Sequence, residues 1–166
     1  MSLSVPDGAV RPASHPDTPA PGTELPPHFR GCFGCGELEG GLRLRQTVGE
    51  DVAVTSTFAV QRHHQGAPGI AHGGVIAAAF DEVFGALAVH HREPSVTAEL
   101  QTRFRRPVPV GSVLHLRTRI DARDGRKIWC SGEGRLDSPD GPVAVEATAL
   151  FVTVPMEHFT THGAPH

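Results

Sequence analysis

The sequence predicts an α+β fold in which one antiparallel sheet of about six strands wraps around a single long helix. Residues 73–89 are apolar except for Asp81 and Glu82, and a helix that is apolar almost all round must be buried. After Pro94 the pattern changes from helical spacing to the alternation of half-buried strands. Tight turns separate these alternating segments, which favours hairpins and an antiparallel sheet.

The expected elements follow in chain order. Strands are predicted at 42–48 and 52–60, on either side of the turn Gly49-Glu50-Asp51, and the loop 61–71 then leads into the helix. Four further strands are predicted at 96–106, 113–122, 126–136 and 143–154. Asp124-Gly125, between the second and third of these, is a strong signal for a two-residue hairpin turn.

The 166 residues fit one folded domain, which we place at 31–155. Residues 1–30 contain seven prolines and few large apolar side chains, so a disordered or loosely draped arm is expected there. Residues 156–166 are predicted to form a short C-terminal tail.

The charge and composition of the chain limit the classes of binding partner that we expect. The formal net charge of -3 argues against nucleic acid, which usually requires a basic face. No apolar run is expected to reach transmembrane length, and neither a membrane anchor nor a secretory signal is visible. We therefore expect a cytoplasmic protein with no membrane partner.

Cysteine usage argues against a disulfide framework, because the count of three is odd. Cys32-Phe33-Gly34-Cys35 has the spacing of half a zinc ribbon, but the second half is missing. Closed zinc sites need four ligands, so ordinary loop cysteines are favoured and no metal is assigned. A site completed by His28, His63 or His64 stays open.

Asp81 is the leading candidate for a catalytic group. At helical spacing it lies on a face of small residues, opposite a bulky stripe formed by Ile76, Phe80, Val83 and Leu87. A carboxylate on an apolar helix destabilises the fold unless it is paired with a cation or has a function. Acids with perturbed pKa values concentrate at functional sites. The alternative is a structural carboxylate paired with an arginine, the role expected for the neighbouring Glu82.

Gly73 and Gly74 open the helix, where unpaired amides and the positive end of the helix dipole can stabilise a developing oxyanion. The alternative is that they only permit close packing. Asp81 lies eight residues beyond Gly73, roughly 12 Å along the helix axis. If both act on one carbonyl, they must come from different subunits.

The chain resembles the hotdog-fold acyl-CoA thioesterases of the phenylacetate-degradation (PaaI-like) type, which depend on an aspartate. The resemblance runs from about Cys32 to Pro155. It is carried by three segments: Gly69-x-x-His72-Gly73-Gly74 with Asp81 seven residues later, Ser95-Val96-Thr97-Ala98-Glu99-Leu100 leading into Phe104-Arg105-Arg106-Pro107-Val108-Pro109-Val110-Gly111, and Cys32-Phe33-Gly34-Cys35-Gly36 followed by Gly41-Leu42.

The resemblance implies hydrolysis of acyl-CoA by a homodimer or a tetramer of hotdog dimers, with no cofactor beyond the coenzyme A of the substrate. It implies that Asp81 is the nucleophile or general base and that the Gly73 amide polarises the thioester carbonyl. Thr97 would help to place water, and His72 would orient the loop and contact substrate. Two alternatives are a non-catalytic acyl-CoA binding module and a hotdog enoyl-CoA hydratase or dehydratase that pairs Asp81 with His72.

The remaining candidates are assigned to substrate binding. Many relatives carry asparagine six residues before the His-Gly-Gly triplet, but this chain has Gly66. Either Gln65 or His64 supplies the missing polar contact, or this branch dispenses with it. Arginine suits phosphate recognition, so the candidates for contacting the substrate are Gly74, Gln65, His64, Arg105 and Arg106, although a solvated strand end would explain the two arginines equally well.

Overall fold

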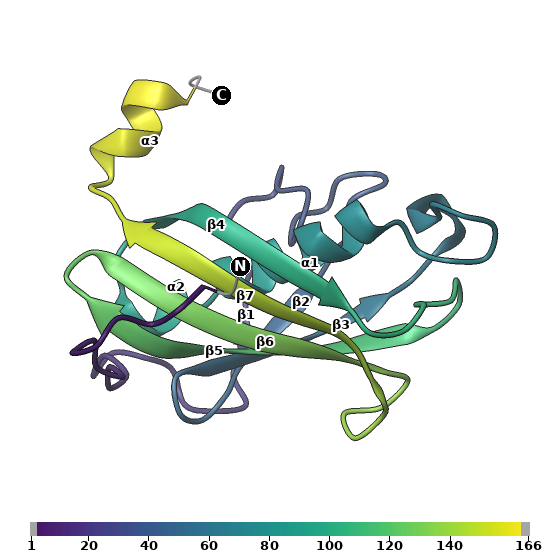
Figure 1. Ribbon diagram of the computed structural model, residues 1–166. Helices are drawn as coiled ribbons and strands as arrows, with labels where there is room; N and C mark the ends of the chain where they lie inside the picture. Colours follow the sequence, from purple (N-terminus) through teal and green to yellow (C-terminus); the bar gives the residue numbers. More distant parts are fainter. Residues whose placement is uncertain (1–2, 164–166) are drawn as a thin grey trace.

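The computed structural model describes residues 3–163 and contains one antiparallel sheet of seven strands in the order β1-β2-β3-β5-β6-β7-β4 (Figure 1). Helix α1 crosses one face of the sheet, as the hotdog arrangement requires, so the predicted fold class is confirmed. The strands are β1 (Glu24–Leu25), β2 (Arg45–Val48), β3 (Ala53–Ala59), β4 (Ser95–Phe104), β5 (Val113–Asp124), β6 (Lys127–Leu136) and β7 (Val143–Thr153). The helices are the 3-10 turn η1 (Arg62–His64) and the α-helices α1 (Gly73–Gly85), α2 (Ala88–His91) and α3 (Glu157–His162).

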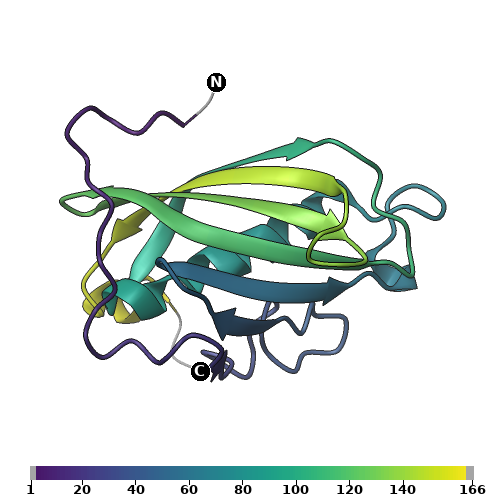
Figure 2. The same cartoon turned by 90° about the horizontal axis from the view of Figure 1, so that it is seen from below.

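The core lies between α1 and the sheet that curves over it (Figure 2). The predicted bulky stripe of the helix is fully buried there. Each such side chain contributes about 1.5–3 kcal/mol by leaving water, which fixes the rotation of α1 about its axis. The largest apolar side chains that are fully buried are Phe58, Phe80, Phe84, Leu44, Ile76, Leu87, Leu114, Leu116, Ile120, Ile128 and Val48.

The other face of α1 is only partly covered, so the expectation of a helix buried all round is wrong for a single chain. Ala77, Ala78 and Gly85 are half-buried and Gly74 is exposed. A Cβ added at Gly85 would meet no atom within 4 Å. The reason is geometric: one sheet covers one side of a helix, and the small-residue face points away from it.

The helical run Gly73–His91 is long and apolar enough to cross a membrane by length and composition, with a mean hydropathy of 1.3. The expectation that no apolar run reaches this length is therefore wrong. The core helix of a globular domain has the same properties, and this run packs its bulky side chains under the sheet. It is also interrupted, because α1 ends at Gly85 and α2 begins only at Ala88.

The strands agree with the predicted pattern, and the clearest case is the β5–β6 hairpin. Asp124 pairs with Lys127 across the turn, and Gly125 has a φ of 53°. The first predicted strand is shorter than expected. The Leu42 and Leu44 amides donate instead to the carbonyls of Phe33 and Gly34, at 2.8 and 2.9 Å, so these residues anchor the cysteine loop before β2 begins.

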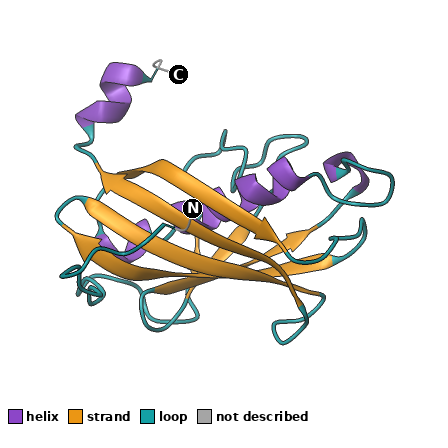
Figure 3. Ribbon diagram, viewed as in Figure 1, coloured by secondary structure: helices purple, strands orange, loops and turns teal. Residues whose placement is uncertain are grey.

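The described part of the N-terminal segment runs along the outside of the domain (Figure 2). Its β1 adds a seventh strand beside β2. The His15 amide donates to the His90 carbonyl at 2.8 Å, and the Ser14 hydroxyl lies 2.9 Å from His90 Nδ1. At the other end of the chain, α3 stands apart from the sheet (Figure 3). The division into arm, domain and tail stays a prediction.

Candidate active site

Asp81 lies on the half-covered face of α1 and accepts a hydrogen bond from the Thr97 hydroxyl at 2.7 Å. Thr97 belongs to β4, at the edge of the sheet, next to a bulge between Thr97 and Glu99 in which Ala98 is the extra residue. A bulge redirects neighbouring side chains, and here one of them meets the helix. Within residues 3–163 no arginine forms an ion pair with Asp81, so the contact expected for a purely structural carboxylate is absent.

The start of α1 leaves one amide available. His72 is the N-cap residue, and its Nδ1 accepts from the Gly74 amide at 2.9 Å while its carbonyl accepts from the Val75 amide at 3.0 Å. Within residues 3–163 the Gly73 amide has no acceptor. An unpaired amide at the positive end of a helix is an anion-binding donor.

His72 is therefore the N-cap of α1. The variant His72→Ala is expected to lower the free energy of unfolding by about 0.5–2 kcal/mol, which is the usual cost of a lost N-cap. Chemical denaturation followed by circular dichroism measures the change. His72→Asn is the matched control, because asparagine is a strong N-cap residue. Equal destabilisation by both variants would contradict the capping role.

Phe104 was not singled out by sequence reasoning, yet it stands over the start of α1. A Cβ added at Gly73 would lie 3.2 Å from Phe104 Cζ, and the phenylalanine is 49% exposed at the end of edge strand β4. An aromatic ring in this position can block access to the Gly73 amide from one side. The sequence feature that could have pointed to Phe104 is its place, as a large apolar residue, directly before two arginines.

His64 and Gln65 hold the loop that leads into α1. His64 is 4% exposed, and its Nδ1 accepts from the Gln61 amide at 3.0 Å. Burial lowers the pKa of His64, so the ring is neutral at pH 7. Gln65 Oε1 accepts from the Gly69 amide at 2.8 Å, at a position whose φ of 77° favours glycine. Contact of His64 or Gln65 with substrate stays a prediction.

Packing against His72 gives a steric reason why this chain has Gly66 where the resembled enzymes often have asparagine. A Cβ added there would lie 2.9 Å from the Cα of His72 and 3.1 Å from its Cβ. Backbone this close cannot give way cheaply, so the loop in its present form requires glycine at this position. A polar side chain at position 66 would need a different approach of the loop to His72.

The two candidate arginines differ in their surroundings. Arg105 donates from Nε and Nη2 to Glu146 Oε2 at 3.0 and 2.7 Å, and both side chains are half exposed. Such a pair contributes about 0–1 kcal/mol, so it does not prevent Arg105 from exchanging partners. Arg106 is exposed. Phosphate binding by either arginine stays a prediction.

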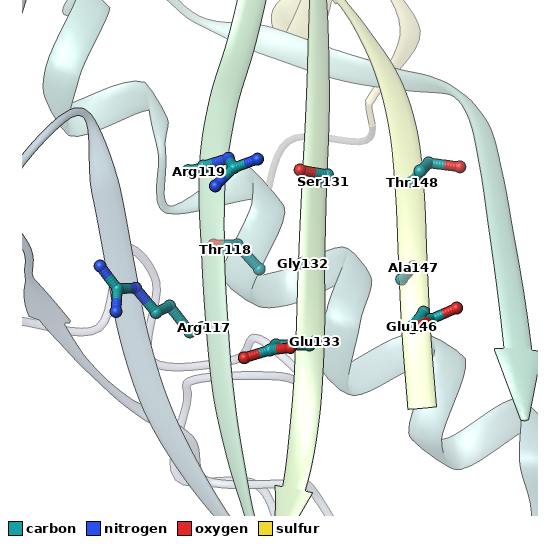
Figure 4. Close-up of a pocket in the computed structure, with 9 residues that line it drawn as sticks. All are labelled: Arg117, Thr118, Arg119, Ser131, Gly132, Glu133, Glu146, Ala147 and Thr148. Carbon is teal, nitrogen blue, oxygen red and sulfur yellow. The ribbon is translucent and has the colours of Figure 1, made fainter. Parts of the chain in front are cut away.

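A hollow of about 500 Å³ lies elsewhere, across the middle of β5, β6 and β7 (Figure 4). Its charged side chains point away from α1, because Thr118 on the same strand points toward the helix and strand residues alternate. This hollow is separate from Asp81. Its lining residues are Arg117, Thr118, Arg119, Ser131, Gly132, Glu133, Glu146, Ala147 and Thr148.

Glu82 does not pair with an arginine in the described part of the chain, so that expectation is wrong. Its Oε1 accepts from Gln46 Nε2 at 3.1 Å, and its Oε2 accepts from the Cys32 thiol at 3.2 Å. Burial, together with the neighbouring Glu82 carboxylate, raises the pKa of the Cys35 thiol to about 12. The tertiary fold, rather than sequence spacing, brings these side chains together.

The comparisons with known proteins concern the family of the chain. A model of the thioesterase superfamily matches residues 68–143, the stretch that carries His72, Asp81 and Thr97. This match covers somewhat less than half of the chain, and over that stretch the chain is similar to the thioesterase superfamily. The chain is also similar to acyl-coenzyme A thioesterase THEM4 of Xenopus laevis, with 36% identity over 88 residues that cover 53% of this chain and 39% of the relative.

Two solved structures share the fold of this chain. The crystal structure of RHA08564, a thioesterase superfamily protein, is 34% identical and has a TM-score of 0.61, covering 68% of this chain and 55% of that one. The PaaI protein of E. coli is 14% identical and has a TM-score of 0.63, covering 69% of this chain and 81% of its own, so it supports the fold alone. The chain spans about two fifths of the length of the curated relatives it matches.

Proposed function

We propose that this protein is a thioesterase of the superfamily matched above and that it hydrolyses acyl-CoA thioesters to a free acid and coenzyme A. The observation that carries the proposal is the 2.7 Å hydrogen bond from Thr97 to Asp81 on the half-covered face of α1. It fixes the position of one carboxylate oxygen. The similarity to relatives named acyl-coenzyme A thioesterases supports the substrate class.

In the proposed reaction, negative charge develops on the thioester oxygen as the carbonyl is attacked. The unpaired Gly73 amide stabilises that charge, and a donor of this kind contributes about 2.7–4 kcal/mol. Asp81 either removes a proton from the attacking water or attacks the carbonyl itself to form an anhydride that water cleaves. Thr97 holds the carboxylate in position for either route. The proposed chemistry needs no cofactor beyond the coenzyme A of the substrate.

The proposed site is completed by a second copy of the chain. Asp81 and the Gly73 amide are separated by roughly 12 Å along α1, too far to act on one carbonyl carbon. Two features support a homodimer that brings together Asp81 of one subunit and Gly73 of the other. Strand β4 lies on a free edge of the sheet, which can pair with another strand, and the small-residue face of α1 is partly uncovered.

A panel of acyl-CoA substrates tests the activity. We expect release of free thiol from at least one short-chain, long-chain or aromatic acyl-CoA, at a rate proportional to enzyme concentration, as measured with a thiol-reactive dye. Binding of acyl-CoA without turnover across the panel would favour a binding module instead. Addition of water to an enoyl-CoA without thiol release would favour a hydratase.

A further inference from the structure

Four potential metal ligands meet beside the helix turn that carries Asp81. They are His28 from the N-terminal segment, Cys32 and Cys35 from the loop before β2, and Glu82 from α1. One ligand atom from each lies within 4.8 Å of all the others. The proposed hydrolysis uses none of these side chains.

The distances among these atoms suit a single small cation. Cys35 Sγ lies 3.0 Å from His28 Nδ1, Cys32 Sγ lies 3.2 Å from Glu82 Oε2, and His28 Nδ1 lies 3.6 Å from Glu82 Oε1. Zinc binds sulfur at about 2.3 Å and nitrogen or oxygen at about 2.0–2.2 Å, so tetrahedral ligand atoms are roughly 3.3–3.8 Å apart. These three separations lie within or slightly below that range, and no pair of the four ligand atoms is more than 4.8 Å apart.

The cysteine loop is folded so that both sulfurs face inward. The Gly34 amide donates to Cys32 Sγ at 3.3 Å, a contact that stabilises charge on a metal-bound sulfur. A Cβ added at Gly36 would lie 2.4 Å from the Arg30 carbonyl oxygen and 2.5 Å from that of Cys32, so this turn requires glycine. A Cβ at Gly34 would lie 2.2 Å from Glu82 Oε2. The two glycines thus allow the loop to close onto the glutamate.

The surroundings of Glu82 also fit a metal ligand. Its side chain is only 13% exposed, and it faces two thiols and an imidazole instead of an arginine. A mostly buried carboxylate is stabilised by a cation or by hydrogen bonds. Gln46, which is 3% exposed, donates to Glu82 Oε1 and fixes its orientation, as outer contacts of metal ligands do. The His28 side chain is 68% exposed, which leaves a path from solvent.

We propose that His28, Cys32, Cys35 and Glu82 bind one structural zinc ion. With all four positions filled by protein, the site is of the closed type that stabilises a fold. It joins the N-terminal segment and the cysteine loop to the helix turn next to Asp81. This differs from the expectation of no metal, because the fourth ligand, Glu82, lies far in sequence from the other three. The proposal does not depend on the proposed hydrolysis.

Metal analysis of the full chain, purified without a histidine tag from zinc-supplemented cells, tests the site. We expect about one zinc ion per wild-type chain and less than about a tenth of that in Cys32→Ser/Cys35→Ser. Replacement of zinc by cobalt should give a sulfur-to-cobalt absorption band in the wild type alone. Cys130→Ser is the matched control, because Cys130 is buried on β6 outside the cluster and its loss should leave the zinc in place.

A second variant keeps the test decisive if the double variant does not fold. His28→Ala removes a mostly exposed side chain and is expected to weaken zinc binding at least about tenfold in competition with a chelator. The exposed His162 provides the control His162→Ala, which should bind zinc as the wild type does. Wild-type protein that stays free of zinc, equal zinc in wild type and cysteine variants, or a Cys32–Cys35 disulfide in the purified protein would each overturn the proposal.

Discussion

Replacing Asp81 with asparagine is expected to lower kcat for acyl-CoA hydrolysis by about 10²–10⁴-fold, the contribution of a positioned acid or base. Asparagine keeps the size of the side chain and an oxygen that can accept the 2.7 Å hydrogen bond from Thr97. It loses the negative charge needed either to take a proton from water or to attack the carbonyl. Steady-state release of free thiol measures the loss, and thermal unfolding checks that the fold is kept.

Glu99→Gln is the matched control for this variant. Glu99 is an exposed carboxylate on β4, the strand that also carries Thr97, and it lies on the other side of the bulge. Its Oε1 accepts a hydrogen bond from Gln101 Nε2 at 2.7 Å. The same change of carboxylate to amide at Glu99 should leave kcat within a few-fold of the wild type. Wild-type turnover by Asp81→Asn would remove Asp81 from the reaction, whichever of its two proposed roles is considered.

The fold was predictable because its strongest signals are local. Bulky residues at helical spacing defined the buried stripe of α1, and Asp124-Gly125 marked the β5–β6 hairpin. The covering of α1 was not predictable in the same way. Apolarity shows that a helix avoids water, but it does not show whether its own sheet or a second chain covers each face. The segment before β2 also escaped prediction, because Leu42 and Leu44 bond to a loop rather than to a strand.

The candidate site was predictable only where its residues form a sequence motif. The spacing from His72 to Asp81 and the strand containing Thr97 pointed to one region, and the structure joins Asp81 to Thr97. The ligand cluster was only partly predictable: the sequence leaves a site with Cys32, Cys35 and His28 as an open alternative, but Glu82 lies about fifty residues further on and its partners are set by tertiary packing. Phe104 escaped for the same reason, because its position over Gly73 depends on how β4 passes the start of α1.

Replacing Gly73 with proline is expected to lower kcat by about 10²–10³-fold, because it removes the one amide assigned to the oxyanion. The backbone tolerates the change. Proline is favoured at the first position of a helix, and the preceding His72 already has φ -68° and ψ 130°, the extended conformation that a following proline requires. Gly73→Ala is the matched control: it places a similar Cβ 3.2 Å from Phe104 but keeps the N–H, so its kcat should stay within a few-fold of wild type.

The same variant tests whether each site combines two subunits. In a dimer of one Asp81→Asn chain and one Gly73→Pro chain, one site lacks both groups while the other has an intact Asp81 and an intact Gly73 amide. Random exchange makes about half of the dimers mixed, so mixing the two inactive variants should restore roughly a quarter of wild-type activity if each site draws one group from each chain. If both groups acted within one chain, every site would still lack one of them. Mixing that restores no activity, with exchange verified by mass spectrometry of intact dimers, would therefore contradict the shared site.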